Sequence, residues 1–244
     1  MQPLTRTTIE RAEEGIETLR HRKLWEGVQI ALLVAMFGSA ALLWSSVPEQ
    51  IPVHWNAAGE VDRYGGRFEG LLLVPLIALG IYLLLLVIPR IDPARRNYEA
   101  FAGTWMLLRV SILVYLAFVG LVTQLAIGRE ETLPAAQLIV GSVGVLFMVL
   151  GGVMGRIEPN WFAGIRTPWT LSSTRSWEAT HRLGGRLFVA LGVLTLIAAV
   201  IGGTVALVTI LGGMLVVLVV VSVYSYRVWR DDPDKVRLAR ADRR

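Results

Sequence analysis

Three side chains in one short segment could bind a metal ion or transfer protons: His54, Glu60 and Asp62. An imidazole and two carboxylates are suitable zinc ligands when they converge on one point. Groups of this kind in one loop more often hydrogen-bond to each other, and the chain has no Cys and three His. We therefore expect no metal ion and no cofactor here, and treat the segment as a candidate ligand-binding loop.

A second segment of unusual chemistry runs from Gly155 to Arg186. It lies between long apolar segments and contains three Trp, five Arg and two Pro. Trp and Arg often dominate the energetics of protein interfaces. They also form the aromatic belts and basic flanks of membrane helices, where they need no protein partner. Composition alone leaves both interpretations open.

The residues around Pro168 predict a short amphipathic helix. Pro168 disfavours a helix immediately before it, and Ser172 or Ser173 offers a cap for a helix that follows. We expect this helix to run from Thr174 to about Leu183 and to end at Gly184-Gly185.

Residues four apart on this helix share a face, which brings Trp177 near His181 and allows Glu178 to pair with Arg182. Glu178 and His181 are three apart, so a membrane enzyme with a proton-transferring pair at these positions is one hypothesis. The chain contains no His-Glu-x-x-His, Gly-x-Ser-x-Gly or P-loop motif. We therefore expect no enzymatic activity.

The elements that position these segments are membrane helices. Of the 244 residues, 54% are hydrophobic, and they occur in blocks of about 20, the length that crosses a bilayer core. The sequence thus predicts an all-α integral membrane protein with six transmembrane helices. A turn at Gly202-Gly203-Thr204 separates the last two, because a single helix of their joint length would be too long. The six segments are 25–47, 70–89, 104–127, 133–154, 186–202 and 205–228.

The chain divides into four predicted regions. They are a cytosolic segment at 1–23, a transmembrane region at 24–128 with a loop at 48–69, a second transmembrane region at 129–230 with a loop at 155–186, and a basic tail at 231–244. Thr7 and Glu10 fit a capping box, which predicts a short cytosolic helix that ends near Lys23. We expect the first apolar segment to be a retained helix, not a cleaved signal peptide.

The distribution of basic residues predicts the orientation in the membrane. The N-terminal segment, the 90–103 loop, the 155–186 loop and the C-terminal tail contain most of the 24 Lys and Arg. The loops on the other side contain Arg63, Arg67 and Arg129. The positive-inside rule therefore places both termini in the cytoplasm (N-in, C-in) and the 48–69 loop outside.

The outer loop is expected to be ordered. Ile51, Val53 and Trp55 alternate with other residues, as in a strand, and the segment from Asn56 to Gly59 has turn chemistry. A compact hairpin-like excursion on the outer face of the membrane is the predicted structure.

Two features inside the apolar segments carry their own predictions. Arg109, near the start of the third helix, is expected to extend its charge to the headgroups, and the alternative is a buried charge that lines a polar pathway. Glycines recur in the fourth helix, and Gly151 and Gly155 make a Gly-x-x-x-Gly step. This spacing predicts close helix packing within the chain, with dimerisation as the alternative.

Two motifs resemble a known family. The segments Asn160–Ser172 (NWFAGIRTPWTLS) and Trp177–Gly185 (WEATHRLGG) closely resemble the signature of the SdpI family. These are bacterial integral membrane proteins named for immunity to a secreted killing-factor peptide. The segments Ile51–Asn56 (IPVHWN) and Gly59–Asp62 (GEVD) resemble the DUF1648 module, which often precedes that signature.

The resemblance implies a multi-pass protein of the bacterial cell membrane with six helices and both termini inside. It implies protection from a secreted antimicrobial peptide, and signalling by holding a cytosolic transcriptional repressor at the membrane. The expected partners are the lipid bilayer, a peptide toxin outside and a repressor inside, without direct binding of nucleic acid.

On this hypothesis the outer loop recognises the ligand and the 155–186 loop binds the cytosolic partner. The ligand-binding candidates are His54, Trp55, Asn56, Glu60 and Asp62. The partner-binding candidates are Asn160, Arg166, Thr167, Pro168, Trp169, Trp177 and His181.

A small-solute transporter is the alternative function. The segment Arg63–Phe68 (RYGGRF) precedes the second predicted helix, and Arg182–Leu187 (RLGGRL) precedes the fifth. This similarity would fit two inverted three-helix repeats, an arrangement found in several transporters. Charged residues are rare within the helices, which argues against an ion-coupled pathway.

Overall fold

The computed structural model describes residues 6–129 and 133–235, with side chains from Arg22 onward. Six of its helices are long and apolar enough to cross a membrane, which confirms the predicted six-span, all-α architecture. The elements, in chain order, are α1 (Arg6–Leu43), β1 (Ile51–Trp55), β2 (Val61–Gly65), the π-helical η1 (Phe68–Leu72), α2 (Leu73–Ile91), α3 (Asn97–Ala100), α4 (Ala102–Ala126), α5 (Ala135–Met154), α6 (Pro168–Leu171), α7 (Thr174–Ile201) and α8 (Gly203–Arg230).

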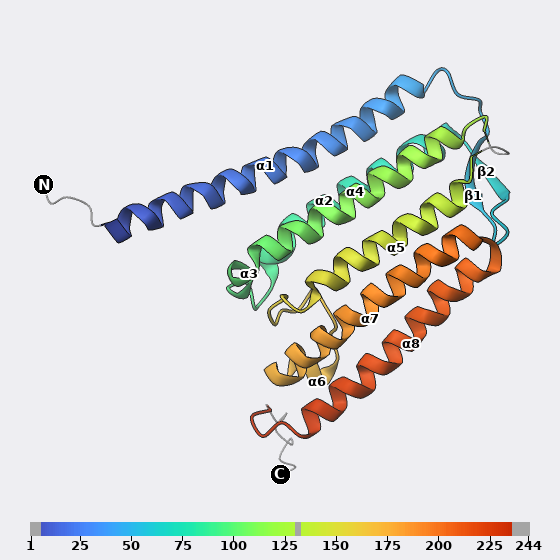
Figure 1. The fold of residues 1–244 in the computed structure, drawn as a ribbon. Helices are drawn as coiled ribbons and strands as arrows, with labels where there is room; N and C mark the ends of the chain where they lie inside the picture. The colour runs from blue at the N-terminus through green and yellow to red at the C-terminus, as the bar shows by residue number, and fades with distance from the viewer. Residues whose placement is uncertain (1–5, 130–132, 236–244) are drawn as a thin grey trace, which may run out of the picture.

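The membrane helices form a row and not a closed bundle (Figure 1). The packed neighbours along the row are α1 and α2 on α4, then α4 on α5, α5 on α7, and α7 on α8. The helices α1, α2 and α4 make up the first half of the chain, and α5, α7 and α8 make up the second half. Contact between α4 and α5 joins the two halves.

The two faces of the row differ in structure. The β1–β2 hairpin and the α7–α8 turn lie at one end of the helices, which we call the hairpin face (Figure 1). The start of α1, the end of α8, the α2–α4 connector (residues 92–101) and the α5–α7 loop (residues 155–173) lie at the opposite end, the terminal face (Figure 1). At the turn, Gly202 and Gly203 have φ values of 73° and 60°, a conformation that favours glycine. The predicted break between the last two spans is therefore confirmed.

The first helix differs from the prediction. Helix α1 continues without interruption from Arg6 to Leu43, so a separate cytosolic helix that ends near Lys23 is wrong. Thr7 lies within this helix and is not its cap. Neither Gly nor Pro occurs between Ile16 and Glu26, so the polar segment continues directly into the apolar one as a helix. The basic tail expected at 231–244 lies mostly outside the described residues.

The helix predicted at Thr174–Leu183 also has a different end. Its start at Thr174 with Ser173 as cap is confirmed, because the Ser173 side chain accepts a hydrogen bond from the Ser176 amide. The helix then continues through Gly184-Gly185 to Ile201 as the membrane-spanning α7. The glycine pair is buried against neighbouring elements. Close packing, and not the end of a helix, therefore explains why glycines occupy these two positions.

Close contact between α5 and α7 depends on glycines on both helices. A Cβ atom on Gly151 would lie 2.6 Å from the Gly185 carbonyl oxygen, and one on Gly192 would lie 2.5 Å from the Gly144 oxygen. Neither distance leaves room for a side chain. The predicted close packing is thus within the chain, but it uses Gly144 and Gly151, seven residues apart, whereas Gly155 at the end of the helix faces Arg182.

Arg109 is buried and does not extend to the headgroups. Its side chain is 5% exposed and donates from Nη1 and Nη2 to Glu26 of α1 at 2.7 and 3.0 Å. Tyr82 completes the cluster, with its hydroxyl 3.3 Å from Glu26 and its ring 5.6 Å from the guanidinium carbon. The snorkelling prediction was wrong because a carboxylate on a neighbouring helix neutralises the charge inside the protein.

The similarity between Arg63–Phe68 and Arg182–Leu187 is not structural. The first segment ends strand β2 and leads into η1, whereas the second lies inside α7. The two halves also pack differently, because α5 packs chiefly on α7, whereas α1 packs more on α4 than on α2. The structure therefore gives no support to inverted repeats.

The glycine contact yields a prediction for stability. Gly151→Ala should lower the free energy of unfolding by about 1–3 kcal/mol, because the added methyl group forces α5 and α7 apart. The measurement is thermal denaturation of the purified chain in detergent. Gly152→Ala is the matched control, since a Cβ there meets nothing within 4 Å. Equal denaturation temperatures for the two variants would contradict the assigned contact.

Candidate ligand and partner sites

The hairpin follows from its turn sequence. The Asn56 side-chain oxygen accepts hydrogen bonds from the amides of Ala58 and Glu60 at 2.8 and 3.1 Å, which reverses the chain. Gly59 adopts a φ of 89° and donates its amide to the Asn56 carbonyl. β1 and β2 then pair antiparallel, with Ile51 opposite Gly65. The predicted hairpin-like excursion is confirmed.

The polar side chains of the hairpin form pairs and not one cluster. His54 Nδ1 lies 2.5 Å from Asp62 Oδ1, whereas the Glu60 carboxylate accepts a hydrogen bond from Asn56 at 3.2 Å. Among the described residues, no three His, Cys, Asp or Glu side chains are placed to hold a metal ion. The hairpin therefore presents polar groups whose positions its own hydrogen bonds define.

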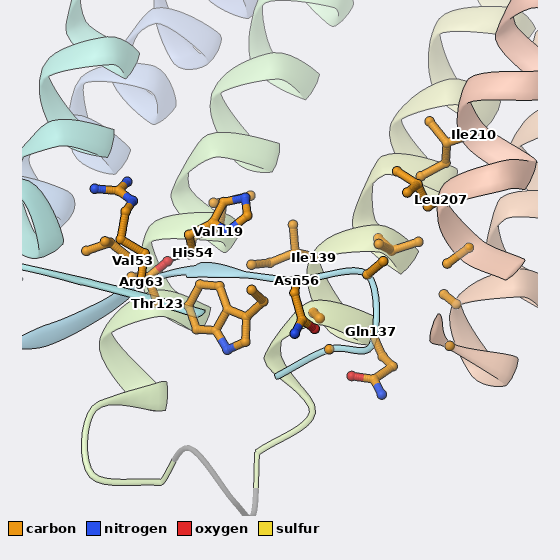
Figure 2. Close-up of a pocket in the computed structure, with 18 of the residues that line it drawn as sticks. Val53, His54, Asn56, Arg63, Val119, Thr123, Gln137, Ile139, Leu207 and Ile210 are labelled. Atoms are coloured by element: carbon orange, nitrogen blue, oxygen red, sulfur yellow. Dashed lines mark hydrogen bonds between the residues drawn. The ribbon is translucent and has the colours of Figure 1, made fainter. Parts of the chain in front are cut away.

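A cavity of about 530 Å³ lies beneath the hairpin, between the two halves of the chain. Figure 2 shows the hairpin residues on one side of it and Leu207 and Ile210 of α8 on the other. Its walls are mainly apolar, and α4 and α5 contribute Val119 and Ile139. Polar groups line it near the hairpin, where Arg63, His54, Asn56, Thr123 and Gln137 are found.

Three of the predicted ligand-binding residues line this cavity: His54, Trp55 and Asn56. Glu60 and Asp62 are not among the lining residues and bond instead to Asn56 and His54. The sequence prediction missed the walls formed by α4, α5 and α8. Polar residues near the ends of apolar segments, such as Thr123 and Gln137, were the available signal.

The α5–α7 loop is irregular but firmly bonded. Thr167 caps α6 by accepting a hydrogen bond from the Thr170 amide, and Pro168 occupies the first helical position. Thr167 also donates to Ser225 of α8 at 3.1 Å. Ser173 donates to Asp232, and this bond holds the pKa of Asp232 below its ordinary value. These bonds tie the loop to the end of α8.

Asn160 organises the first part of this loop. It is 2% exposed, and its side-chain oxygen accepts from the amides of Phe162 and Ala163 at 2.9 and 2.6 Å. Its side-chain nitrogen donates to the Glu158 carbonyl at 2.9 Å. One buried side chain thus satisfies three backbone groups that no helix or strand would satisfy.

Asp92 connects the loop to the first half of the chain. Its carboxylate is buried and accepts hydrogen bonds from the Trp161 amide at 3.0 Å and from the Tyr98 hydroxyl at 2.9 Å. Burial, and the hydrogen bond to Asp92, raise the pKa of Tyr98, so the hydroxyl keeps the proton that it donates. Asn97 adds a bond to the Pro159 carbonyl at 2.7 Å. The α2–α4 connector and the α5–α7 loop therefore form one hydrogen-bonded unit.

Trp177 and His181 are structural partners of this loop. Both side chains are 1% exposed, and their rings stack with centroids 4.1 Å apart. Trp177 Nε1 donates to the Ile157 carbonyl at 2.7 Å. His181 Nε2 accepts from the Ile165 amide at 2.9 Å, so Nδ1 carries the proton and donates to the Trp177 carbonyl.

The predicted sharing of a face by Trp177 and His181 is thus confirmed, and so is the pair of Glu178 and Arg182, 3.4 Å apart. Glu178 is exposed and His181 is buried, with both ring nitrogens bonded to backbone. A proton-transferring pair of Glu178 and His181, as the enzyme hypothesis requires, is not formed.

Burial separates the predicted partner-binding residues into two groups. Asn160, Trp177 and His181 lie in the interior, where a partner could not touch them without unfolding the loop. Arg166 and Pro168 are exposed, and Thr167 and Trp169 are partly so. The structure adds two exposed aromatic side chains that the prediction omitted, Trp161 at 53% and Phe162 at 37%.

Comparison with known proteins agrees with the motifs. The model of the SdpI/YfhL protein family matches residues 156–225, and that of a domain of unknown function, DUF1648, matches residues 31–79. The chain is 24% identical over 205 residues to the Immunity protein SdpI of Bacillus subtilis (strain 168), which covers 83% of this chain and 95% of the relative. No solved structure matches the chain with significance.

The two matched segments contain the structures described above. The DUF1648 match includes the hairpin, and the SdpI/YfhL match includes nearly all of the α5–α7 loop together with α7 and most of α8. With its six membrane-spanning helices, the chain is therefore a multi-pass protein of the bacterial cell membrane that contains an SdpI/YfhL-type region in its second half and a DUF1648 region in its first half.

Proposed function

We propose that this protein confers immunity on the cell that makes it, by binding a secreted antimicrobial peptide in the cavity beneath the hairpin. The observation that carries the proposal is the similarity over 83% of the chain to a protein named for immunity. A role in binding, and not in catalysis, is consistent with the buried, fully bonded state of His181.

The side chains that line the cavity beneath the hairpin suit an amphipathic peptide. Its deep walls are apolar, and its hairpin side offers an imidazole, an amide and the ion pair of Arg63 and Glu69, 2.7 Å apart. A peptide that inserts into a membrane surface has the same division between an apolar and a polar side. His54, Trp55 and Asn56 would then contact the peptide, and Asp62 and Glu60 would position two of these residues.

The proposal requires the hairpin face to lie outside the cell. The distribution of Lys and Arg supports this orientation, since the hairpin carries Arg63 whereas the α2–α4 connector and the α5–α7 loop together carry Arg95, Arg96, Arg156 and Arg166. Both termini and the α5–α7 loop then face the cytoplasm.

A second part of the proposal concerns a cytosolic partner, a transcriptional repressor held at the terminal face. The exposed side of the α5–α7 loop offers Trp161, Phe162 and Arg166, residue types that are enriched at binding surfaces. Arg166 also donates to the Trp161 carbonyl at 2.7 Å, which holds these residues together.

Immunity is tested by deleting the gene and growing the cells in spent medium of the parent strain. The deletion strain should be inhibited, and the wild-type gene should restore growth. Ile210→Trp, which fills the cavity from α8, should fail to restore it, with a tolerated peptide concentration lower by about tenfold or more. Leu211→Trp is the control, because Leu211 is 61% exposed on the same helix and does not line the cavity. Unchanged growth of the deletion strain would refute the proposal.

The orientation is tested with single cysteines, since the chain has none. Gly66→Cys lies at the exposed end of the hairpin and Arg96→Cys lies in the exposed α2–α4 connector. A membrane-impermeant maleimide should label the first variant in intact cells and both variants after lysis. Labelling of Arg96→Cys alone in intact cells would reverse the orientation.

The partner surface is tested by affinity purification of the tagged full chain from cross-linked cells. A soluble DNA-binding protein should co-purify with the wild type and with Trp44→Ala, a variant of an exposed Trp beside the hairpin face. The double variant Trp161→Ala/Phe162→Ala should lose it, because it removes the exposed aromatic contact area. Recovery of the same partner with the double variant, or of no such partner with the wild type, would contradict this part of the proposal.

A further inference from the structure

A second cavity, of about 740 Å³, lies at the terminal face within the first half of the chain. Its walls come from α1, α2, α4 and the α2–α4 connector. The candidate membrane span of α2 ends at Ile91, and that of α4 begins at Ala102. The cavity therefore lies where the helices leave the apolar core of the membrane.

The lining of this terminal-face cavity is basic at one end. Four arginines line it, and Glu99 is the single carboxylate among the described lining residues. Three of the arginines are exposed: Arg22 within α1, Arg90 near the end of α2, and Arg95 in the α2–α4 connector. Arginine side chains at this depth attract anionic headgroups.

The fourth arginine, Arg109, lies at the inner end of the same cavity. Its Nη atoms bond to Glu26, but its buried Nε has no hydrogen-bond partner among the described residues. The residue as a whole is 4% exposed. A buried N–H group without a partner has a large free-energy cost, which a ligand oxygen or a water molecule in the cavity would remove.

The remaining walls are apolar and aromatic. Leu85 and Leu86 of α2 and Leu107 and Val110 of α4 line the cavity, together with Trp25 and Trp105. Tryptophan is favoured at the boundary between acyl chains and headgroups. A water-soluble anion would gain nothing from these walls, whereas an acyl chain would bury apolar surface against them.

We propose that the terminal-face cavity is a binding site for an anionic phospholipid. The headgroup phosphate pairs with Arg22, Arg90 and Arg95, and the acyl chains lie along the leucines of α2 and α4. The site is separate from the cavity beneath the hairpin, and it does not depend on the immunity proposal.

The test compares lipids added to the full chain in detergent micelles. Dioleoyl phosphatidylglycerol should raise the thermal denaturation temperature, and dioleoyl phosphatidylcholine at equal mole fraction should raise it less. Arg90→Gln/Arg95→Gln should weaken the apparent affinity for phosphatidylglycerol by about 30-fold, as expected for the loss of two cationic contacts. Arg96→Gln/Arg156→Gln removes two exposed arginines of the same face that do not line the cavity, and should bind normally.

A second variant blocks the cavity without a change of charge. A Cβ on Gly103 meets nothing within 4 Å, and this residue lines the cavity, so Gly103→Leu should fill it and abolish the preference for phosphatidylglycerol. Gly80→Leu is the control, because it is equally unhindered but does not line the cavity. Both variants should denature at similar temperatures in phosphatidylcholine.

Four results would overturn the proposal. They are equal effects of the two lipids on the wild type, an unchanged affinity in Arg90→Gln/Arg95→Gln, an unchanged preference in Gly103→Leu, and full reproduction of the effect by inorganic phosphate. The last result would identify a site for free phosphate and not for a lipid.

Discussion

The structure depends on satisfying the backbone of an irregular loop at the membrane boundary. Polar backbone groups at this depth need partners, because neither a regular helix nor bulk water supplies them. In the α5–α7 loop the partners are buried side chains: Asp92 for the Trp161 amide, Asn160 for two further amides, His181 for the Ile165 amide, and Trp177 for the Ile157 carbonyl. Each bond joins the loop to itself or to another element, so the same interactions that satisfy the loop also hold the helices in register.

This arrangement explains why an open row of helices has a defined structure. At the terminal face, bonds from Asp92 and Asn97 join the first half to the loop, and Thr167 and Ser173 join the loop to α8. Between the faces, glycines allow α5 and α7 to approach closely. At the hairpin face, Trp55 packs with apolar residues of α4 and α5. The cavity beneath the hairpin is thus framed by contacts between the halves, which a single helix pair could not provide.

The sequence was informative where structure is local and poor where it depends on distant residues. Block length predicted six spans, and the turn residues from Asn56 to Gly59 predicted the hairpin, because both signals act over a few residues. Gly184-Gly185 was wrongly predicted to end a helix, because the glycines are needed for close packing against α5, which the local sequence does not reveal. The ion-pair partner of Arg109 is Glu26, which is 83 residues away in the sequence, so local sequence could not predict the pair. The Trp and His residues in the α5–α7 loop and at the start of α7 are of types that are common at binding surfaces. Only the fold shows that Trp177 and His181 are buried inside the protein.

Contacts between the two halves of the chain lie between the hairpin face and the terminal face. On the proposed function, a ligand in the cavity beneath the hairpin would contact α4 on one side and α5 and α8 on the other, so its binding would depend on the relative position of the halves. At the opposite face, Asp92 and Asn97 of the first half bond to the Trp161 amide and the Pro159 carbonyl. Ile165 and Thr167 of the same loop bond instead to α7 and α8. A ligand can shift such an equilibrium only if it binds one arrangement more tightly than another. Any shift between the halves would act directly on the Asp92–Trp161 bond, which lies next to the exposed side chains of Trp161 and Phe162.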